Sequence, residues 1–179
     1  PKQFIREDSI LIHCASSGVY GGESLTTQMA INVERTIQFL KTAVDFGVKR
    51  ILVCGSGLEY GQLNVIIPKT VHTRLSPETD YAKSKVVAFM KLQQIFHNSN
   101  IDLTWMRIFQ VFGPGERFPR LGPSILQAYL DKTDFFLKRP YDIRDFAHIC
   151  DISEAILKCV NTLNGFQVIN MSTGHGTSN

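Results

Sequence analysis

Short apolar runs alternate with longer amphipathic stretches along most of this chain. The apolar runs have the length of strands buried on both faces of a parallel sheet, and they lie at residues 9–14, 50–54, 102–108 and 167–171. The amphipathic stretches repeat apolar residues every three or four positions, the helical period, over residues 27–46, 80–97, 124–130 and 152–163. The alternation predicts an α/β fold in which helices cover a parallel sheet.

Residues 55–79 separate the second expected strand from the second long helix, and their pattern predicts no regular structure. A segment of this length without structure is usually functional or a lid. Its glycines, Gly55, Gly57 and Gly61, suggest a dinucleotide-binding turn, which needs a helix directly after it. No helical period follows Gly61 and Pro68 interrupts the segment, so a phosphate loop is disfavoured here. A dinucleotide-binding turn would then have to precede Pro1.

The composition limits the classes of function. The 179 residues, 44% of them hydrophobic, suffice for one core of ordinary size. The formal net charge is +3 and the basic residues are scattered, so nothing indicates a nucleic-acid partner. No apolar stretch approaches the roughly 18 residues of a membrane span. We therefore expect neither a nucleic-acid-binding protein nor a membrane protein.

The cysteines form no Cys-x-x-Cys pair and lie in or beside apolar segments: Cys14, Cys54, Cys150 and Cys159. They predict reduced, buried thiols in a cytoplasmic protein. His13 and His148 are interpreted as core histidines, and no metal site is expected. The chain begins at Pro1 without a signal segment and ends at Asn179 without a closing element, which favours an internal piece of a longer protein.

Tyr81 and Lys85 are the strongest chemical signal, one helical turn apart near the start of a helix. An ammonium close to the Tyr81 phenol would favour the phenolate, and a pKa about 3 units below the usual value near 10 needs roughly 4 kcal/mol of differential stabilisation. Such a tyrosine is a plausible general base at neutral pH. The alternative is a solvated helix face with one packed tyrosine.

These residues also carry a resemblance to a known family. Tyr81 to Lys85, preceded by Cys54 to Gly61, resembles the extended short-chain dehydrogenase/reductases, specifically the NAD-dependent epimerase/dehydratase family that acts on nucleotide sugars. Further segments are similar to family motifs in the same order: Ile12 to Ser16, Asn32 with Thr36, Arg107 to Pro114, Arg144 to Asp151 and Asn170 to Ser178. The similarity covers nearly the whole chain.

The resemblance implies a partial doubly wound parallel sheet, Rossmann-like but lacking its first strands, with a small substrate-binding cap. Residues 1–111 with 146–164 would form the dinucleotide-binding part, and residues 112–145 with 165–179 would face the substrate. Because the first strands are missing, the chain by itself is expected to be poorly soluble or to bind cofactor weakly.

The resemblance also implies roles for individual residues. Ser56, Tyr81 and Lys85 would be catalytic, with Tyr81 exchanging a proton with the sugar while hydride moves to or from NAD or NADP. Lys85 would in addition bind the nicotinamide ribose. The other residues implied at the cofactor are Ala15, Ser16, Asn32 and Phe109, and those implied at a nucleotide-diphosphate sugar are Gln110 and Arg144. Ser56 could instead be an ordinary turn residue, and Arg144 could form a surface ion pair with Asp145.

Two departures from the family pattern concern the type of reaction and the contact with the diphosphate. The sugar dehydratases of the family carry Asp-Glu after the catalytic Thr, whereas Gly57 and Leu58 stand there and Glu59 comes one residue late, which disfavours dehydration. This leaves 4-epimerisation or reduction of a 4-keto sugar, with a slight lean toward reduction. Gln110 replaces the usual Asn, and its extra methylene moves the amide by roughly 1.5 Å.

Partners and rival functions follow from the same resemblance. Helices about 27–46 and 81–97 resemble those that form a dimer interface in the family, so a homodimer is expected, and products for surface polysaccharide are an expectation of the family. The rival hypotheses are a non-catalytic sensor or scaffold on this fold and an inactive remnant. The sequence does not distinguish NAD from NADP, or one sugar nucleotide from another.

Overall fold

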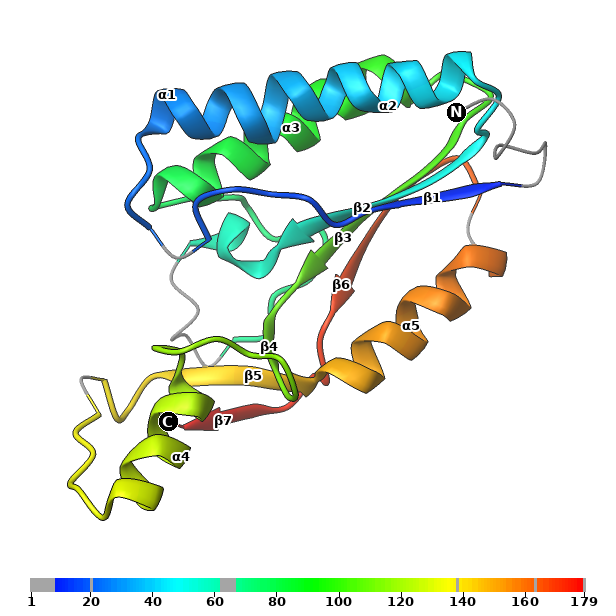
Figure 1. Cartoon of the computed structure of the whole chain (residues 1–179). Coiled ribbons are helices and arrows are strands. Elements are labelled where there is room, and N and C mark those ends of the chain that lie inside the picture. Colours follow the sequence, from blue (N-terminus) through cyan, green and yellow to red (C-terminus); the bar gives the residue numbers. More distant parts are fainter. Residues whose placement is uncertain (1–8, 20, 62–66, 138, 163, 179) are drawn as a thin grey trace.

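The computed structural model describes residues 9–19, 21–61, 67–137, 139–162 and 164–178. The expectations that concern Pro1 and Asn179 fall outside these residues. Figure 1 shows a larger sheet between helices and a smaller sheet beside its lower end. None of the described helices is long and apolar enough to cross a membrane.

The larger sheet is parallel throughout and confirms the predicted α/β fold. Its strands run in the order β1-β2-β3-β6, with bounds Ile10–His13, Arg50–Ser56, Asp102–Ile108 and Phe166–Met171. The central strands β2 and β3 are buried on both faces, which explains their uninterrupted apolar sequences.

Helices cover both faces of this sheet, as in a doubly wound fold (Figure 1). On one face a continuous helical run consists of α1 (Leu25–Gln28), a π-helical segment (Met29–Arg35) and α2 (Thr36–Asp45), and it packs beside α3 (Asp80–Phe96). On the other face α5 (Ile149–Thr162) packs on Leu52 and Met106. The predicted helix 27–46 is therefore present but contains an unpredicted π-helical middle.

Both long helical segments begin at side-chain caps. Ser24 accepts a hydrogen bond from the Thr27 backbone N–H at 3.2 Å, and Thr79 accepts one from the Ala82 N–H at 3.1 Å. Such caps satisfy N–H groups that lack partners in the first helical turn. The cap at Thr79 fixes where α3 begins, and with it the position of Tyr81 in the first turn.

The smaller sheet was not predicted from the sequence. It consists of β4 (Gln110–Phe112) parallel to β5 (Ile143–His148), and of β7 (Gly176–Ser178) antiparallel to β5. Helix α4 (Leu121–Asp131) lies beside it (Figure 1) and begins earlier than the expected residue 124.

The expected division of the chain differs from the observed topology at β6. Residues 165–179 were assigned to the substrate-facing region, but β6 pairs with β3 in the larger sheet, and only β7 joins the smaller one. Conversely, residues 146–148 belong to β5 of the smaller sheet. The chain thus crosses between the two sheets as often as the predicted boundaries imply, but at different residues.

Candidate active site

The predicted catalytic residues meet at the carboxyl ends of the parallel strands. Ser56 ends β2, Ser16 follows β1, and Phe109 and Gln110 follow β3 directly. Because neighbouring parallel strands end at the same edge of a sheet, these residues are brought together although they are far apart in sequence. Tyr81 faces the same edge from the first turn of α3.

A cavity of about 230 Å³ forms at this edge, and we call it the Ser56–Tyr81 cavity. Its lining includes hydroxyl groups from Ser16, Ser56 and Tyr81, with Phe109 and Gln110 on the β3 side. Ala15 is exposed beside Ser16 and does not line this cavity. The cavity therefore combines hydroxyl groups that can exchange protons with an aromatic wall.

Ser56 is held by a single 3₁₀ turn, Gly57–Tyr60. Its hydroxyl oxygen accepts a hydrogen bond from the Leu58 N–H at 3.2 Å, and its own N–H donates to Glu59 Oε1 at 2.8 Å. The flanking glycines are needed for space: a Cβ on Gly55 would lie 2.3 Å from Trp105 Nε1, and one on Gly57 would lie 3.0 Å from the Phe109 ring. The glycines thus allow the close packing around Ser56, and the next α-helix among the described residues is α3, which begins at Asp80.

Lys85 lies near the Tyr81 ring and is anchored to the end of β2. The Lys85 Nζ donates to the Cys54 carbonyl oxygen at 2.9 Å and lies 5.8 Å from the centroid of the Tyr81 ring. Both side chains are buried, with exposed fractions of 9% for Tyr81 and 4% for Lys85.

Burial is the largest influence on the pKa of Tyr81. Burial raises the pKa of Tyr81, and the nearby Ser16 and Ser56 hydroxyls only partly oppose this effect. Burial likewise lowers the pKa of Lys85. The net shift is therefore upward, and the expectation that Lys85 lowers the Tyr81 pKa stays a prediction.

Asn32 has a different place from the one expected of a cofactor ligand. It is 2% exposed, and its amide nitrogen donates to the Ser17 carbonyl and to Ser84 Oγ, both at 2.9 Å. Its Oδ1 accepts from the Ser17 N–H at 2.8 Å. Both amide hydrogens are used within the protein, so Asn32 can act on a cofactor only indirectly, by fixing the Ser17 segment to α3.

Gln110 also lines a second, larger cavity of about 660 Å³, which we call the arginine cavity. Three guanidinium groups line it, from Arg120, Arg139 and Arg144, together with the aromatic residues Phe135, Phe136 and Phe146. Glu116 pairs with Arg120, and Asp142 pairs with Arg139 and Arg144. The described lining of the cavity holds the three arginines and no carboxylate, a property that the scattered sequence positions of these arginines did not reveal.

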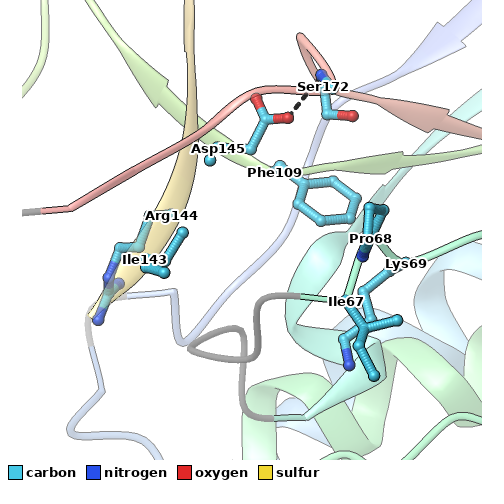
Figure 2. A pocket seen from close by; sticks show the side chains of 10 residues that line it. Ile67, Pro68, Lys69, Phe109, Ile143, Arg144, Asp145 and Ser172 are labelled. Carbon is cyan, nitrogen blue, oxygen red and sulfur yellow. Dashed lines mark hydrogen bonds between the residues drawn. The ribbon is translucent and has the colours of Figure 1, made fainter. Parts of the chain in front are cut away.

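Arg144 lies between the arginine cavity and a smaller cavity of about 120 Å³, drawn in Figure 2. Figure 2 shows Arg144 and Ile143 on β5, across from Pro68 and Lys69, with the Phe109 ring next to Pro68. Arg144 Nη2 pairs with Asp142 Oδ2 at 3.0 Å, not with Asp145 as the alternative interpretation supposed.

Asp145 instead holds the loop after β6. Its carboxylate accepts hydrogen bonds from the backbone N–H groups of Thr173 at 2.8 Å and of Gly174 at 2.7 Å. Asp145 therefore fixes β5 to the loop that follows β6, while the adjacent Arg144 pairs with Asp142.

A buried charged network supports Ser56 and was missed by sequence reasoning. Glu59 is fully buried and accepts from Arg107 Nε at 2.8 Å and from Trp105 Nε1 at 3.0 Å. Arg107 Nη1 also donates to the Tyr60 hydroxyl at 2.9 Å. Burial raises the pKa of Glu59, although its hydrogen bonds with the Ser56 N–H and Arg107 counteract part of this effect. The signal that could have revealed the network is the capping-box spacing, Ser56 followed three residues later by Glu59.

The predicted core histidines pack against aromatic rings. His13 lies with its ring centroid 5.7 Å from that of Phe39, and His148 lies 5.3 Å from that of Phe112. In the described part of the chain, no three His, Cys, Asp or Glu side chains are grouped as metal ligands.

The doubly wound sheet, with Ser, Tyr and Lys gathered at the carboxyl ends of its strands, places the chain in the class of extended short-chain dehydrogenase/reductases. The model of the NAD dependent epimerase/dehydratase family matches residues 3–172. The chain therefore belongs to this family.

Individual relatives agree with this assignment. The chain is 28% identical over 172 residues to a UDP-glucuronate 4-epimerase of Thermodesulfobacterium geofontis, covering 93% of this chain and 52% of that protein. It is also 28% identical over 151 residues to a UDP-glucose 4-epimerase of Mycoplasma genitalium, covering 73% and 44% respectively. The chain thus spans about half the length of these relatives.

Solved structures share the fold. The Bordetella bronchiseptica enzyme WbmG, crystallised with NAD and UDP, is 26% identical with a TM-score of 0.76, over 93% of this chain and 51% of that one. A UDP-glucose 4-epimerase of Thermotoga maritima gives a TM-score of 0.81 at 20% identity, over 93% and 56%. At this lower identity the second likeness supports the fold alone.

Proposed function

We propose that this chain carries the Ser-Tyr-Lys site of an NAD(P)-dependent nucleotide-sugar enzyme that acts at C4 of the sugar, as a 4-epimerase or a 4-keto reductase. The observation that carries the proposal is the Ser56–Tyr81 cavity, which is lined by both hydroxyl groups and lies beside Lys85. The relatives named UDP-glucose and UDP-glucuronate 4-epimerase support the choice of reaction.

The residues fit a nicotinamide cofactor. Ser16, Phe109 and the buried Lys85 lie around the Ser56–Tyr81 cavity and offer a hydroxyl group, a flat wall and an ammonium group. When bound, the cofactor would accept or donate the hydride. The chain would use NAD or NADP, and the crystallisation of WbmG with NAD supports this assignment.

Tyr81 would exchange the proton that accompanies hydride transfer. Because burial raises its pKa, the Tyr81 phenol is protonated at neutral pH and is suited to donate a proton to the oxygen of a 4-keto sugar. The Ser56 hydroxyl, from the same cavity, would hydrogen-bond that oxygen. Lys85 would stabilise the phenolate that remains, and this sequence of events favours the reductive half of the chemistry.

Dehydration is not part of the proposal. Glu59 is the only acidic residue of the Ser56 turn, and it is fully buried and bonded to Arg107, Trp105 and the Ser56 N–H. It therefore offers no free carboxylate to the Ser56–Tyr81 cavity.

The arginine cavity would bind the nucleotide diphosphate. Arg144 and Arg120 supply guanidinium groups, which suit phosphate oxygens, and Phe135 or Phe146 supplies apolar surface for a base. Gln110 lines both cavities and would lie where the sugar joins the diphosphate.

The direct test is to assay the full chain with two substrate classes. Incubation with UDP-glucose and NAD should give UDP-galactose, detectable by NMR, if the enzyme is an epimerase. Incubation with a nucleotide 4-keto-6-deoxyhexose and NADPH should consume reduced nicotinamide if it is a reductase. Absence of turnover in both assays, from a folded chain that binds NAD in calorimetry, would favour the sensor, scaffold or remnant hypotheses.

Replacing Arg144 by alanine should raise KM for the nucleotide sugar about tenfold with little change in kcat. The reason is that a charge-assisted contact with a diphosphate is worth about 1.5–3 kcal/mol, and partial exposure of Arg144, 32%, reduces that value. Steady-state kinetics measures KM and kcat separately. Arg117→Ala, an exposed arginine that lines neither cavity, is the control and should change neither constant.

We further propose that the chain forms a homodimer through the outer surface of α2 and α3. Phe39 and Met90 on these helices are 52% and 54% exposed, and such apolar side chains suit an interface. Met90→Glu should shift the protein from dimer to monomer in light scattering coupled to gel filtration. Leu157→Glu on α5, at the opposite face of the sheet, should leave the mass unchanged; a dimer that survives Met90→Glu would argue against this interface.

A further inference from the structure

Two cysteine thiols face each other at the carboxyl ends of β1 and β2. Cys14 and Cys54 have a sulfur-to-sulfur distance of 3.6 Å. The parallel register pairs His13 with Val53, and each cysteine is the residue that follows in its segment, Cys14 just beyond β1 and Cys54 within β2. Neighbouring strands lie about 4.8 Å apart, within the Cα separation of about 4.4–6.8 Å that a disulfide bridges. A disulfide would thus require only a local approach of the two sulfurs.

The two thiols differ in their surroundings. Cys14 is exposed, whereas Cys54 is half-buried. Burial, followed by the influence of Cys14, raises the pKa of Cys54 to about 12, while Lys85 acts in the opposite direction. Cys54 therefore keeps its proton and donates it toward Cys14 Sγ, the more accessible sulfur.

Lys85 makes the pair unlike the other cysteines. Its ammonium group donates to the Cys54 carbonyl at 2.9 Å, so a cationic side chain is bonded to the backbone of this pair. Cys150 and Cys159 lie on α5, and neither is within bonding distance of another described cysteine.

We propose that Cys14 and Cys54 form an oxidation site that hydrogen peroxide converts into an intramolecular disulfide. The Cys14 thiolate attacks one peroxide oxygen, an S–O bond forms, the O–O bond breaks and the leaving hydroxide takes up a proton to become water. The Cys54 sulfur, losing its proton, then attacks the Cys14 sulfur, so that the S–S bond forms and the S–O bond breaks with loss of a second water. Two thiols are oxidised to one disulfide, and one peroxide is reduced to two waters.

The disulfide would form at the edge of the catalytic cavity. Cys54 lines the Ser56–Tyr81 cavity, and its carbonyl oxygen holds Lys85. Shifting Cys54 toward Cys14 would move the lysine anchor and the start of the Ser56 turn. This consequence rests on the proposed function: turnover should fall on oxidation and return when a thiol reductant is added.

Peptide mapping of the full chain tests the site directly, because trypsin separates the four cysteines. Cys14, Cys54, Cys150 and Cys159 fall in peptides 7–35, 51–69, 145–158 and 159–179. The chain is treated with hydrogen peroxide, remaining thiols are blocked with N-ethylmaleimide, and the digest is analysed by mass spectrometry without reduction. We expect peptides 7–35 and 51–69 to be joined, with the mass of two hydrogen atoms lost from their sum. Dithiothreitol should release them.

Matched variants make the result decisive. Cys54→Ser should abolish the joined peptide, and Cys150→Ser should leave it unchanged. Maleimide on both Cys14 and Cys54 after peroxide treatment, or a link that involves peptide 145–158 or 159–179 instead, would overturn the proposal. The mass reports the disulfide whether or not the chain turns over a nucleotide sugar, so its failure is distinguishable from failure of the proposed function.

Discussion

Tyr81→Phe should lower kcat about 10³-fold while changing cofactor affinity by less than about twofold. Loss of a positioned proton donor typically costs 10²–10⁴-fold in rate, and Tyr81 lines the Ser56–Tyr81 cavity with its hydroxyl beside those of Ser16 and Ser56. The ring remains to pack in the 9%-exposed position, so the fold should be preserved. Single-turnover kinetics, with cofactor binding followed by calorimetry, measures both quantities.

The control for this substitution is Tyr129→Phe. Tyr129 lies on α4 and is 79% exposed, so removing its hydroxyl should alter neither kcat nor cofactor affinity. If Tyr81→Phe retains the turnover of the unmodified chain, Tyr81 is not the proton donor and the Ser-Tyr-Lys assignment fails.

The larger sheet was predictable because its strands are buried on both faces. Leu103 and Trp105 on β3 are fully buried, and such strands leave a continuous apolar signal in the sequence. The smaller sheet leaves no such signal. Its strand β4 has three residues, and its strand β5 carries Arg144 and Asp145 at half-buried positions, so its pairing depends on partners distant in the chain.

The meeting of the candidate site residues at one edge of the sheet was predictable for a topological reason, and their contacts were not. Ser56 ends β2 and Gln110 comes shortly after the neighbouring parallel strand β3, so the order of elements is enough to bring them to one edge. The partner of Lys85 is a backbone carbonyl, and the partner of Arg144 is Asp142 rather than the adjacent Asp145. Such choices depend on side-chain packing, which a linear pattern does not encode.

The network beneath Ser56 leads to the second large prediction: Glu59→Gln should destabilise the fold by about 3–5 kcal/mol. Removing one partner of a buried ion pair leaves the other charge uncompensated, and this is the usual size of that cost. Arg107 is 2% exposed and its Nε lies 2.8 Å from Glu59 Oε2, so water cannot replace the lost carboxylate. Urea unfolding monitored by circular dichroism measures the change in free energy of unfolding.

A second ion pair in the same chain provides the matched control. Glu116 Oε1 pairs with Arg120 Nε at 3.1 Å, but the side chains are 12% and 27% exposed. Because solvent reaches this pair, Glu116→Gln should cost less than about 1 kcal/mol. Equal losses in the free energy of unfolding for the two substitutions would show that burial of the Glu59–Arg107 pair does not increase the cost of breaking it.

The double variant Glu59→Gln with Arg107→Met separates the charge from the packing. Burial raises the pKa of Glu59, because desolvation opposes its ionised form. Replacing both members of a buried ion pair by well-packed uncharged groups is often close to neutral. Removing both charges should therefore cost at least about 1 kcal/mol less than the sum of the single substitutions. In the double variant the amide carbonyl introduced at position 59 can still accept from the Ser56 N–H, so the Ser56 turn should survive. Arg107→Met alone would instead leave the Glu59 carboxylate without its cationic partner. Additive costs in this double-mutant cycle would mean that the two side chains stabilise the turn independently, as packing groups rather than as a pair.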